Sequence, residues 1–149
     1  MRRPEGKVAL VPGTARGLGK AAALRFAAEG ALVVGGDLLH DEALETQREI
    51  GREGGTALTA GPLDVTRPES VEAWVAEAVE AFGGVDIVLT SAGSVRFGPL
   101  VEQSYDDYAS TVRSELDSGG SPPVPRGRTW HVAAAASSPS ARRPGSAAP

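Results

Sequence analysis

The sequence predicts an α/β fold in which a doubly wound parallel sheet occupies residues 1–117 and a disordered tail occupies residues 118–149. Three observations lead to this prediction. Short apolar runs alternate with helical patterns as far as residue 117, which is typical of a parallel sheet covered by helices on both faces. A glycine-rich turn joins the first run to the first helix, and the composition changes abruptly after Asp117. Right-handed crossovers between successive strands give the strand order 3-2-1-4.

The first half of this alternation contains two strands and two helices. We expect a strand over residues 7–11 and a helix over residues 17–29, with Gly30 as its C-cap. The continuous apolar run over residues 31–35 predicts a second, fully buried strand. A polar helix is expected over residues 41–52, so the order strand, helix, strand, helix is established before the chain midpoint.

The second half predicts two further strands and two further helices. Residues 56–61 predict a weak third strand and residues 85–90 a fourth. Between them, Thr66 and Glu69 fit a capping box, with Thr66 as the N-cap of the next helix. That helix has one apolar face, whose members recur at steps of three and four residues: Val71, Trp74, Val75, Ala78, Val79 and Phe82. A last helix is expected over residues 104–116.

The glycine-rich turn is the strongest functional signal in the chain. Gly13, Gly17 and Gly19 lie between an apolar strand and a helix. Glycine lets the backbone approach phosphate groups closely, and the first N–H groups of a helix carry partial positive charge. A strand, a glycine turn and a helix in this order therefore predict a binding site for the pyrophosphate of a dinucleotide.

Asp37 is the predicted ligand of the adenosine ribose. It follows the second strand, 18 residues after Gly19, which is near the spacing of an acid that binds ribose hydroxyls. A carboxylate there accepts hydrogen bonds from the diol and repels a 2′-phosphate, so it favours NAD over NADP. Arg16 has the opposite tendency, because a cation in the turn attracts a 2′-phosphate, but Asp37 lies where the ribose is expected. The alternative is that Asp37 only caps the following helix.

With three further motifs, this turn resembles the short-chain dehydrogenase/reductase family, which has a Rossmann-type fold. Residues 7–19 resemble the family's opening strand and its Thr-Gly-x-x-x-Gly-x-Gly turn. The pair Asp64-Val65 resembles the Asp-Val pair that holds the adenine. Residues 90–93, Thr-Ser-Ala-Gly, resemble the Asn-Asn-Ala-Gly segment after the fourth strand, and Gly-Pro-Leu at residues 98–100 resembles a motif shortly after it. The resemblance covers residues 6 to about 117.

The resemblance implies an NAD(P)-dependent oxidoreductase that moves hydride between a nicotinamide cofactor and an alcohol/ketone pair. The implied cofactor is NAD, preferred over NADP because of Asp37. The expected cofactor-binding residues lie in the glycine turn and directly after successive strands. They are Gly13, Arg16, Gly17, Leu18, Gly19, Asp37, Leu38, Asp64, Val65, Ser91, Ala92 and Gly93.

The chain also departs from the family pattern. Pro12 replaces a Thr, Ser91 replaces an Asn, and Glu115 stands where an Asn of the catalytic tetrad is expected. The family's chemistry needs a Tyr-x-x-x-Lys pair and a serine, yet neither Tyr105 nor Tyr108 is followed by a lysine four residues later. No catalytic residue is therefore named, and we expect only the cofactor-binding half, inactive alone, with a small-molecule substrate bound only in a full-length form. The alternative is a non-catalytic dinucleotide-binding module or a non-functional truncated product.

The tail, residues 118–149, is expected to be disordered because it is rich in Pro, Ser, Gly and Ala and poor in large apolar residues. No strand is expected after Leu116, so the apolar edge of the fourth strand is predicted to be exposed. The resemblance also makes oligomerisation doubtful, because the family's usual dimer contacts use the fourth and fifth helices. One hypothesis is a frameshift after Asp117. Codons can be chosen for residues 126–131 that encode Trp-Pro-His-Leu-Ala in another reading frame. This sequence resembles a Pro-His-Met/Leu stretch that family members often have between the fourth helix and the strand of the catalytic serine. A genuine disordered tail is the other hypothesis.

Other classes of function have little support. The chain has no cysteine, and His40 and His131 are isolated, so no metal site is predicted. Residues 1–117 hold all 19 acidic residues and 11 of the 15 Lys and Arg, a balance that argues against nucleic acid as a partner. No apolar run is long enough to cross a membrane, and residues 1–5 lead directly into a strand, so cytoplasmic localisation is expected.

Overall fold

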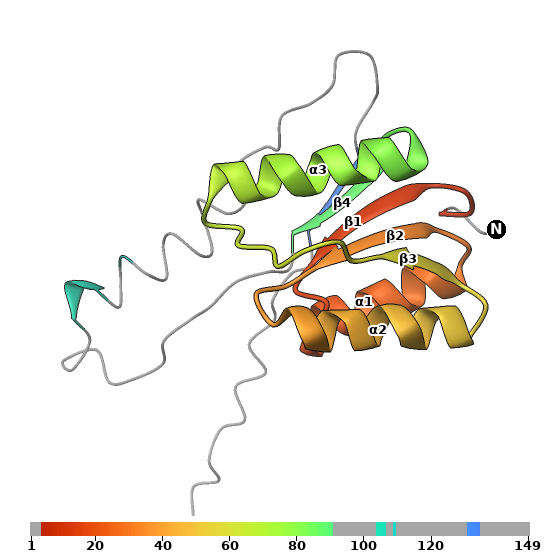
Figure 1. Ribbon diagram of the computed structural model, residues 1–149, viewed down its shortest axis with the longest axis horizontal. Helices are drawn as coiled ribbons and strands as arrows, with labels where there is room; N and C mark the ends of the chain where they lie inside the picture. The colour runs from red at the N-terminus through yellow and green to blue at the C-terminus, as the bar shows by residue number, and fades with distance from the viewer. Residues whose placement is uncertain (1–3, 91–103, 107–108, 110–130, 135–149) are drawn as a thin grey trace, which may run out of the picture.

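The computed structural model describes residues 4–90, 104–106, 109 and 131–134. Its helices and strands alternate along the chain, as Figure 1 shows. In chain order they are β1 (Val8–Pro12), α1 (Gly17–Ala28), β2 (Leu32–Gly36), α2 (His40–Arg52), β3 (Thr56–Leu58), α3 (Pro68–Phe82), β4 (Ile87–Thr90) and β5 (His131–Ala134). Of the predicted last helix, Tyr105, Asp106 and Ala109 are helical, and its other residues lie outside the described part of the chain.

All strand pairs in the sheet are parallel, and the strand order is β3-β2-β1-β4-β5. The predicted order 3-2-1-4 is therefore confirmed. Helices α1 and α2 cover one face of the sheet, and α3 covers the other (Figure 1). Because the strands run in one direction, the loops that follow β1, β2 and β3 all lie at one edge, where α/β proteins bind their ligands.

The fifth strand corrects one expectation from the sequence. We expected no strand after Leu116, but His131–Ala134 pairs in parallel with β4, from Ile87 opposite His131 to Thr90 opposite Ala134. The predicted exposure of the β4 edge is wrong at this segment. The prediction failed because the strand is short and rich in Ala, which has low β-propensity. Its hydrogen bonds come from a partner more than 40 residues away in sequence.

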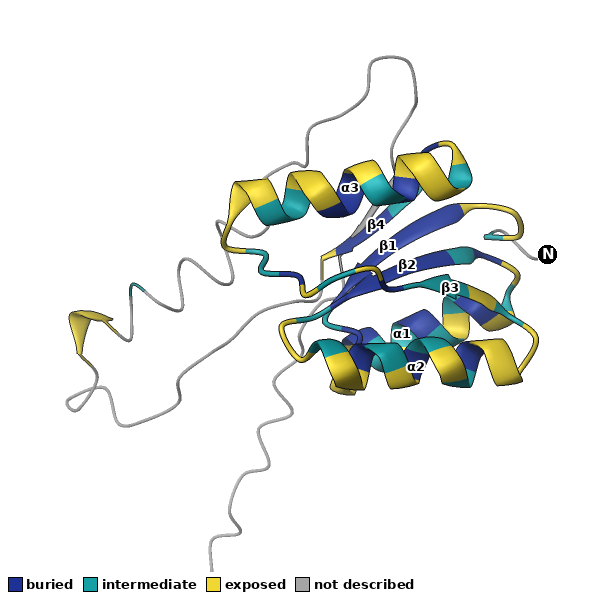
Figure 2. Ribbon diagram, in the orientation of Figure 1, coloured by how far each residue is buried: buried dark blue, intermediate teal, exposed yellow. Residues whose placement is uncertain are grey.

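Two apolar clusters lie on opposite faces of the sheet, because side chains alternate along each strand. In β1, Val8 and Leu10 face the α3 side, whereas Ala9 and Val11 face the α1 and α2 side. Figure 2 shows these central strands in the colour of buried residues. Trp74 of α3 lies in the first cluster, as expected, and its indole N–H donates to the Gly35 carbonyl oxygen at 3.0 Å.

The predicted start of α3 is wrong by one residue. The N-cap is Arg67, with no side-chain cap, and Pro68 takes the first helical position. Proline fits that position because its fixed φ suits a helix and it has no N–H to satisfy. Thr66 instead donates its hydroxyl to Asp64 Oδ1 at 2.6 Å, and Glu69 pairs with Arg67. The capping box of Thr66 and Glu69 therefore does not form.

The remaining element boundaries differ from the predictions by small shifts. Helix α1 has Glu29 at its C-cap, and Gly30 follows with a φ of +88°. Val79, predicted on the apolar face of α3, is exposed. No helix among the described residues is long and apolar enough to span a membrane.

Candidate functional site

The glycine turn connects β1 to α1 at the carboxyl edge of the sheet. Gly13 and Gly17 have φ values of +78° and +61°, which only glycine adopts readily. Gly19 lies on the first turn of α1, and a Cβ there would come within 2.1 Å of the Gly13 carbonyl oxygen. The turn is also bonded to β2, because the Gly13 N–H donates to the Gly36 carbonyl oxygen at 2.7 Å. Each glycine is thus required by backbone geometry, and α1 begins at this turn with no side-chain cap on its N-terminus.

Asp37 lies directly after β2 and joins two loops of this edge. Its Oδ2 accepts a hydrogen bond from the Ala15 N–H at 3.0 Å, and its Oδ1 accepts one from the Leu39 N–H at 3.0 Å. The alternative role of Asp37 as a helix cap is wrong, because α2 has Leu39 at its N-cap and no side-chain cap. The side chain expected to bind ribose is therefore attached to the turn expected to bind phosphate.

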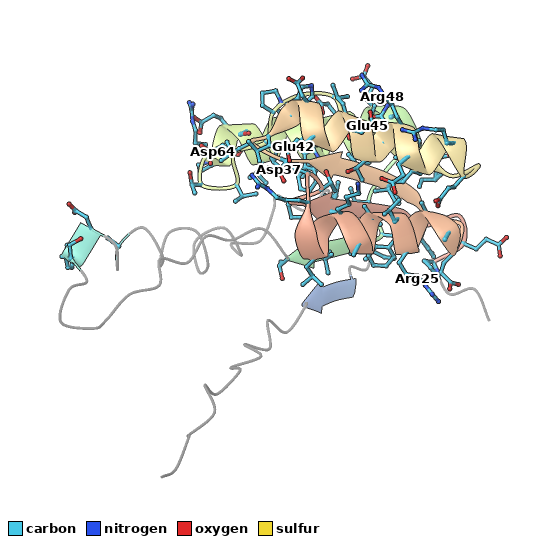
Figure 3. All side chains as sticks on the ribbon, turned by 90° about the horizontal axis from the view of Figure 1, so that it is seen from below. Arg25, Asp37, Glu42, Glu45, Arg48 and Asp64 are labelled. Carbon is cyan, nitrogen blue, oxygen red and sulfur yellow. The ribbon has the colours of Figure 1, made fainter. Side chains whose placement is uncertain are left out.

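Arg16 and two leucines form the exposed rim of the site. The Arg16 Nε lies 3.9 Å from Glu42 Oε2 of α2, with both side chains more than half exposed (73% and 53%). Leu18 of the turn and Leu38 after Asp37 are exposed apolar side chains. Figure 3 shows Asp37, Glu42 and Asp64 toward the same end of the molecule, away from Arg25. The rim therefore combines one paired cation with exposed apolar side chains.

Asp64 follows β3 in the loop that leads to α3. Its Oδ1 accepts hydrogen bonds from the Thr66 hydroxyl at 2.6 Å and from the Thr66 N–H at 3.0 Å. These bonds, together with the charge of Arg67, lower the pKa of the Asp64 carboxyl below its usual range. Val65 packs against the apolar cluster under α3. The other predicted site residues, Ser91, Ala92 and Gly93, lie outside the described residues.

One residue of the site was missed by sequence reasoning. Thr46 of α2 is 1% exposed, and its hydroxyl donates to the Thr14 carbonyl oxygen at 2.8 Å. It occupies the buried face of α2 between Ala43 and Ile50. A threonine on the apolar face of an otherwise polar helix is the signal that would have drawn attention to it.

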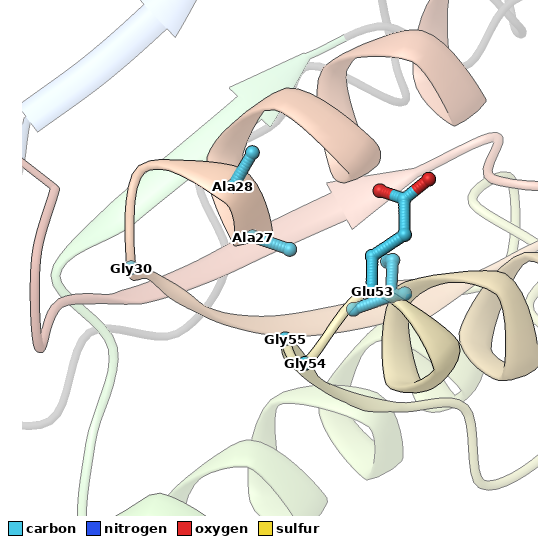
Figure 4. A pocket seen from close by; sticks show the side chains of 7 residues that line it. Ala27, Ala28, Gly30, Glu53, Gly54 and Gly55 are labelled. Carbon is cyan, nitrogen blue, oxygen red and sulfur yellow. The ribbon is translucent and has the colours of Figure 1, made fainter.

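A cavity of about 230 Å³ lies at the opposite edge of the sheet. It is formed where α1 and α2 end, and Figure 4 shows Glu53 beside Gly54 and Gly55 with Ala27 and Ala28 of α1 nearby. It shares no residue with the glycine turn. No group of His, Cys, Asp or Glu among the described residues is arranged to hold a metal ion.

Comparison with known proteins identifies the family. A family model described as enoyl-(acyl carrier protein) reductase matches residues 13–119. The chain belongs to the short-chain dehydrogenase/reductase family. It is 46% identical over 110 residues to 2,5-dichloro-2,5-cyclohexadiene-1,4-diol dehydrogenase of Sphingobium indicum, and 38% identical over 115 residues to 3-oxoacyl-[acyl-carrier-protein] reductase of Vibrio cholerae. These matches cover 74% and 76% of this chain, but only 44% and 45% of the relatives.

Solved structures of this family have the same arrangement. A 7α-hydroxysteroid dehydrogenase complexed with NADH and 7-oxo glycochenodeoxycholic acid matches with a TM-score of 0.73 and 31% identity. A short-chain dehydrogenase from Burkholderia cenocepacia in complex with NADP matches with a TM-score of 0.71 and 35% identity. The matches cover 78% of this chain in both cases, and 45% and 47% of the neighbours. The chain therefore spans less than half the length of these relatives.

Proposed function

We propose that this chain binds NAD(H) at the carboxyl edge of its sheet, as the cofactor-binding part of a short-chain dehydrogenase. The observation that carries this proposal is the junction of the glycine turn with Asp37. The turn presents a helix N-terminus to the pyrophosphate, while Asp37 stands beside it where the adenosine ribose would lie. The bound nicotinamide would exchange hydride with an alcohol/ketone pair in the full-length form.

The preference for NAD over NADP follows from the acceptors that Asp37 still has available. A carboxylate offers about four lone-pair positions, and two backbone N–H groups occupy one on each oxygen. The remaining positions suit the two hydroxyls of a ribose diol. A 2′-phosphate would instead bring negative charge against this carboxylate. Arg16, the cation of the glycine turn, has Glu42 as a counter-charge at 3.9 Å.

We propose that these 149 residues by themselves bind NAD(H) but do not catalyse hydride transfer. Their sequence contains no Tyr-x-x-x-Lys pair, the arrangement that supplies the family's proton transfer. The same observation favours the second candidate, a non-catalytic dinucleotide-binding module. A mixture of the chain with NAD and a panel of alcohols is expected to produce no NADH absorbance. Turnover of any alcohol would overturn the proposed absence of catalysis.

Cofactor choice is tested by titrating the chain with NADH and with NADPH and following nicotinamide fluorescence. We expect NADH to bind at least about tenfold more tightly, which corresponds to about 1.4 kcal/mol. Asp37→Asn should reduce this ratio to about threefold or less, because the charge that repels the 2′-phosphate is removed. The matched control is Asp41→Asn, which removes an exposed acid from the first turn of α2. Tighter binding of NADPH, or no binding of either, would contradict the proposal.

The origin of residues 118–149 is tested separately, at the level of the coding DNA. We propose that the catalytic half belongs to a longer form of the protein. Sequencing from the codon for Asp117 onward and translating every frame should reveal a serine strand followed by Tyr-x-x-x-Lys. If no frame contains them, the non-catalytic binding module becomes the better description.

A further inference from the structure

A single peptide group in the glycine turn is held at both of its polar ends by side chains from other elements. The group joins Thr14 to Ala15. Its carbonyl oxygen accepts a hydrogen bond from the Thr46 hydroxyl at 2.8 Å, and its N–H donates to Asp37 Oδ2 at 3.0 Å. We propose that Thr46 is a positioning residue for the cofactor, which acts by fixing the orientation of this peptide plane together with Asp37. The inference rests on the proposed binding of a dinucleotide.

Because Thr46 is buried, water does not compete for its bond to the turn. The residue is 1% exposed, so water cannot replace the Thr14 carbonyl as its partner. Its hydroxyl also lies 3.3 Å from the Glu42 carbonyl oxygen of the preceding helical turn. The hydroxyl has a single proton to donate, and the bond to the Thr14 carbonyl oxygen, at 2.8 Å, is nearer to the usual O–H···O length than the one to Glu42. Thr46 therefore connects α2 to the glycine turn across 32 residues of sequence.

Close contacts also hold Thr14, the residue that precedes this peptide group, against β2. Thr14 is 2% exposed, and its side chain lies so close to β2 that a Cβ on Gly35 would approach its Oγ1 to 2.9 Å. The Thr14 N–H also lies 3.3 Å from the Gly36 carbonyl oxygen. A rotation of the Thr14–Ala15 peptide plane would break both side-chain bonds, the one from Thr46 and the one to Asp37.

The consequence for binding is preorganisation. A phosphate site made of backbone N–H groups binds well only when those groups already point toward the anion, because ordering a mobile loop reduces affinity. The Thr14–Ala15 peptide precedes the segment from Arg16 to Gly19 that opens α1. Its fixed orientation sets the direction in which this segment leaves β1. Because Asp37 forms one of the two bonds, the position of this proposed ribose ligand is fixed relative to the glycine turn that would bind the phosphates.

The experiment compares Thr46→Val, which keeps the shape and removes the hydroxyl, with Thr46→Ser, which keeps the hydroxyl. NADH affinity is measured by fluorescence titration, and exchange of the Ala15 amide is measured by NMR or mass spectrometry on the chain without cofactor. Thr46→Val should weaken NADH binding and speed Ala15 exchange, each by about fivefold to tenfold, the effect expected from loss of one buried hydrogen bond. Thr46→Ser should stay within about twofold of the unmodified chain.

The matched control is Thr59→Val, which removes another buried threonine hydroxyl, one that lies outside the glycine turn. It should leave NADH affinity and Ala15 exchange unchanged. Equal losses in Thr46→Val, Thr46→Ser and Thr59→Val would overturn the proposed role of Thr46, and so would unchanged values in Thr46→Val. If the unmodified chain binds no dinucleotide, the proposed function fails. The Ala15 exchange rates would still decide whether Thr46 holds the turn.

Discussion

The two faces of the sheet are packed in different ways. On the α3 side, Trp74 and Val75 of the helix are buried in one cluster with the large apolar side chains of the sheet. On the α1 and α2 side, most of the fully buried helix residues are small, as Ala23 and Ala27 are, and Ile50 is the large exception. Large side chains fill space and bury apolar area, whereas small ones let a helix backbone come close to the strands. On the face that carries the glycine turn, the backbone of α1 therefore lies close to the backbone at the end of β1, as it does at Gly19.

The difference agrees with the proposed dinucleotide site. The turn must bring α1 directly onto the end of β1 so that its first N–H groups stand at the carboxyl edge of the sheet. At Gly19 even one additional carbon atom would collide with the turn. The α3 face has no such requirement, and its contribution is burial. Substitutions that remove side-chain atoms should therefore lower the free energy of unfolding most on the α3 face. Substitutions that add atoms should lower it most on the α1 face.

The largest expected effect is on the α3 face. Trp74→Ala should destabilise the fold by about 3–5 kcal/mol, because it leaves a cavity in the cluster and removes the indole bond to the Gly35 carbonyl. Trp74→Phe keeps most of the apolar volume and should cost about 1–2 kcal/mol. Urea unfolding followed by circular dichroism measures both. A loss below about 1 kcal/mol for Trp74→Ala would show that this face does not depend on large side chains.

The second effect tests the α1 face by adding one carbon atom. Gly19→Ala should cost about 3 kcal/mol, because the new Cβ would meet the backbone of Gly13, which cannot move aside as a side chain would. The matched variant is Gly17→Ala, where no atom lies within 4 Å of the added Cβ but φ is +61°. It should cost only about 1–2 kcal/mol, the penalty of a left-handed conformation. If Gly17→Ala cost more than Gly19→Ala in the same urea unfolding assay, the proposed close approach would be refuted.

The smallest effect concerns Asp64, in the loop that enters the α3 face. Its pKa is lower in the folded chain than its ordinary value, mainly because the Thr66 hydroxyl donates to the ionised carboxyl. A carboxyl of this kind stabilises the fold when ionised. Its contribution is present above the unfolded pKa of about 3.9 and is lost as the pH falls through the lower folded value.

Thermal melts of the unmodified chain and of Asp64→Asn between pH 5 and pH 2.5 measure this contribution. The difference in Tm between them should shrink as the pH falls. The effect should be small, because Asp64 is only half-buried and water screens its interactions. A difference that stays constant over this range would show that the ionised carboxyl contributes nothing to stability.

Prediction from the sequence succeeded where the signal is local and repeated. The strand order, the glycine turn and the place of Asp37 follow from apolar runs, glycine spacing and the handedness of crossovers. It failed at α3, where Pro68 rather than Thr66 decides the first helical residue. It also failed at His131–Ala134, where an alanine-rich segment of low β-propensity becomes a strand through pairing with β4.

The sequence by itself determined the family, the parallel sheet and the edge at which a dinucleotide is expected, because these depend on patterns between near neighbours in the chain. Only the tertiary structure decided how Asp37 and Thr46 hold one peptide group from opposite sides. Those bonds join residues 22 and 32 positions apart, and no periodicity or spacing rule encodes which donor meets which acceptor. The orientation of the glycine turn therefore depends on how β2 and α2 pack beside it.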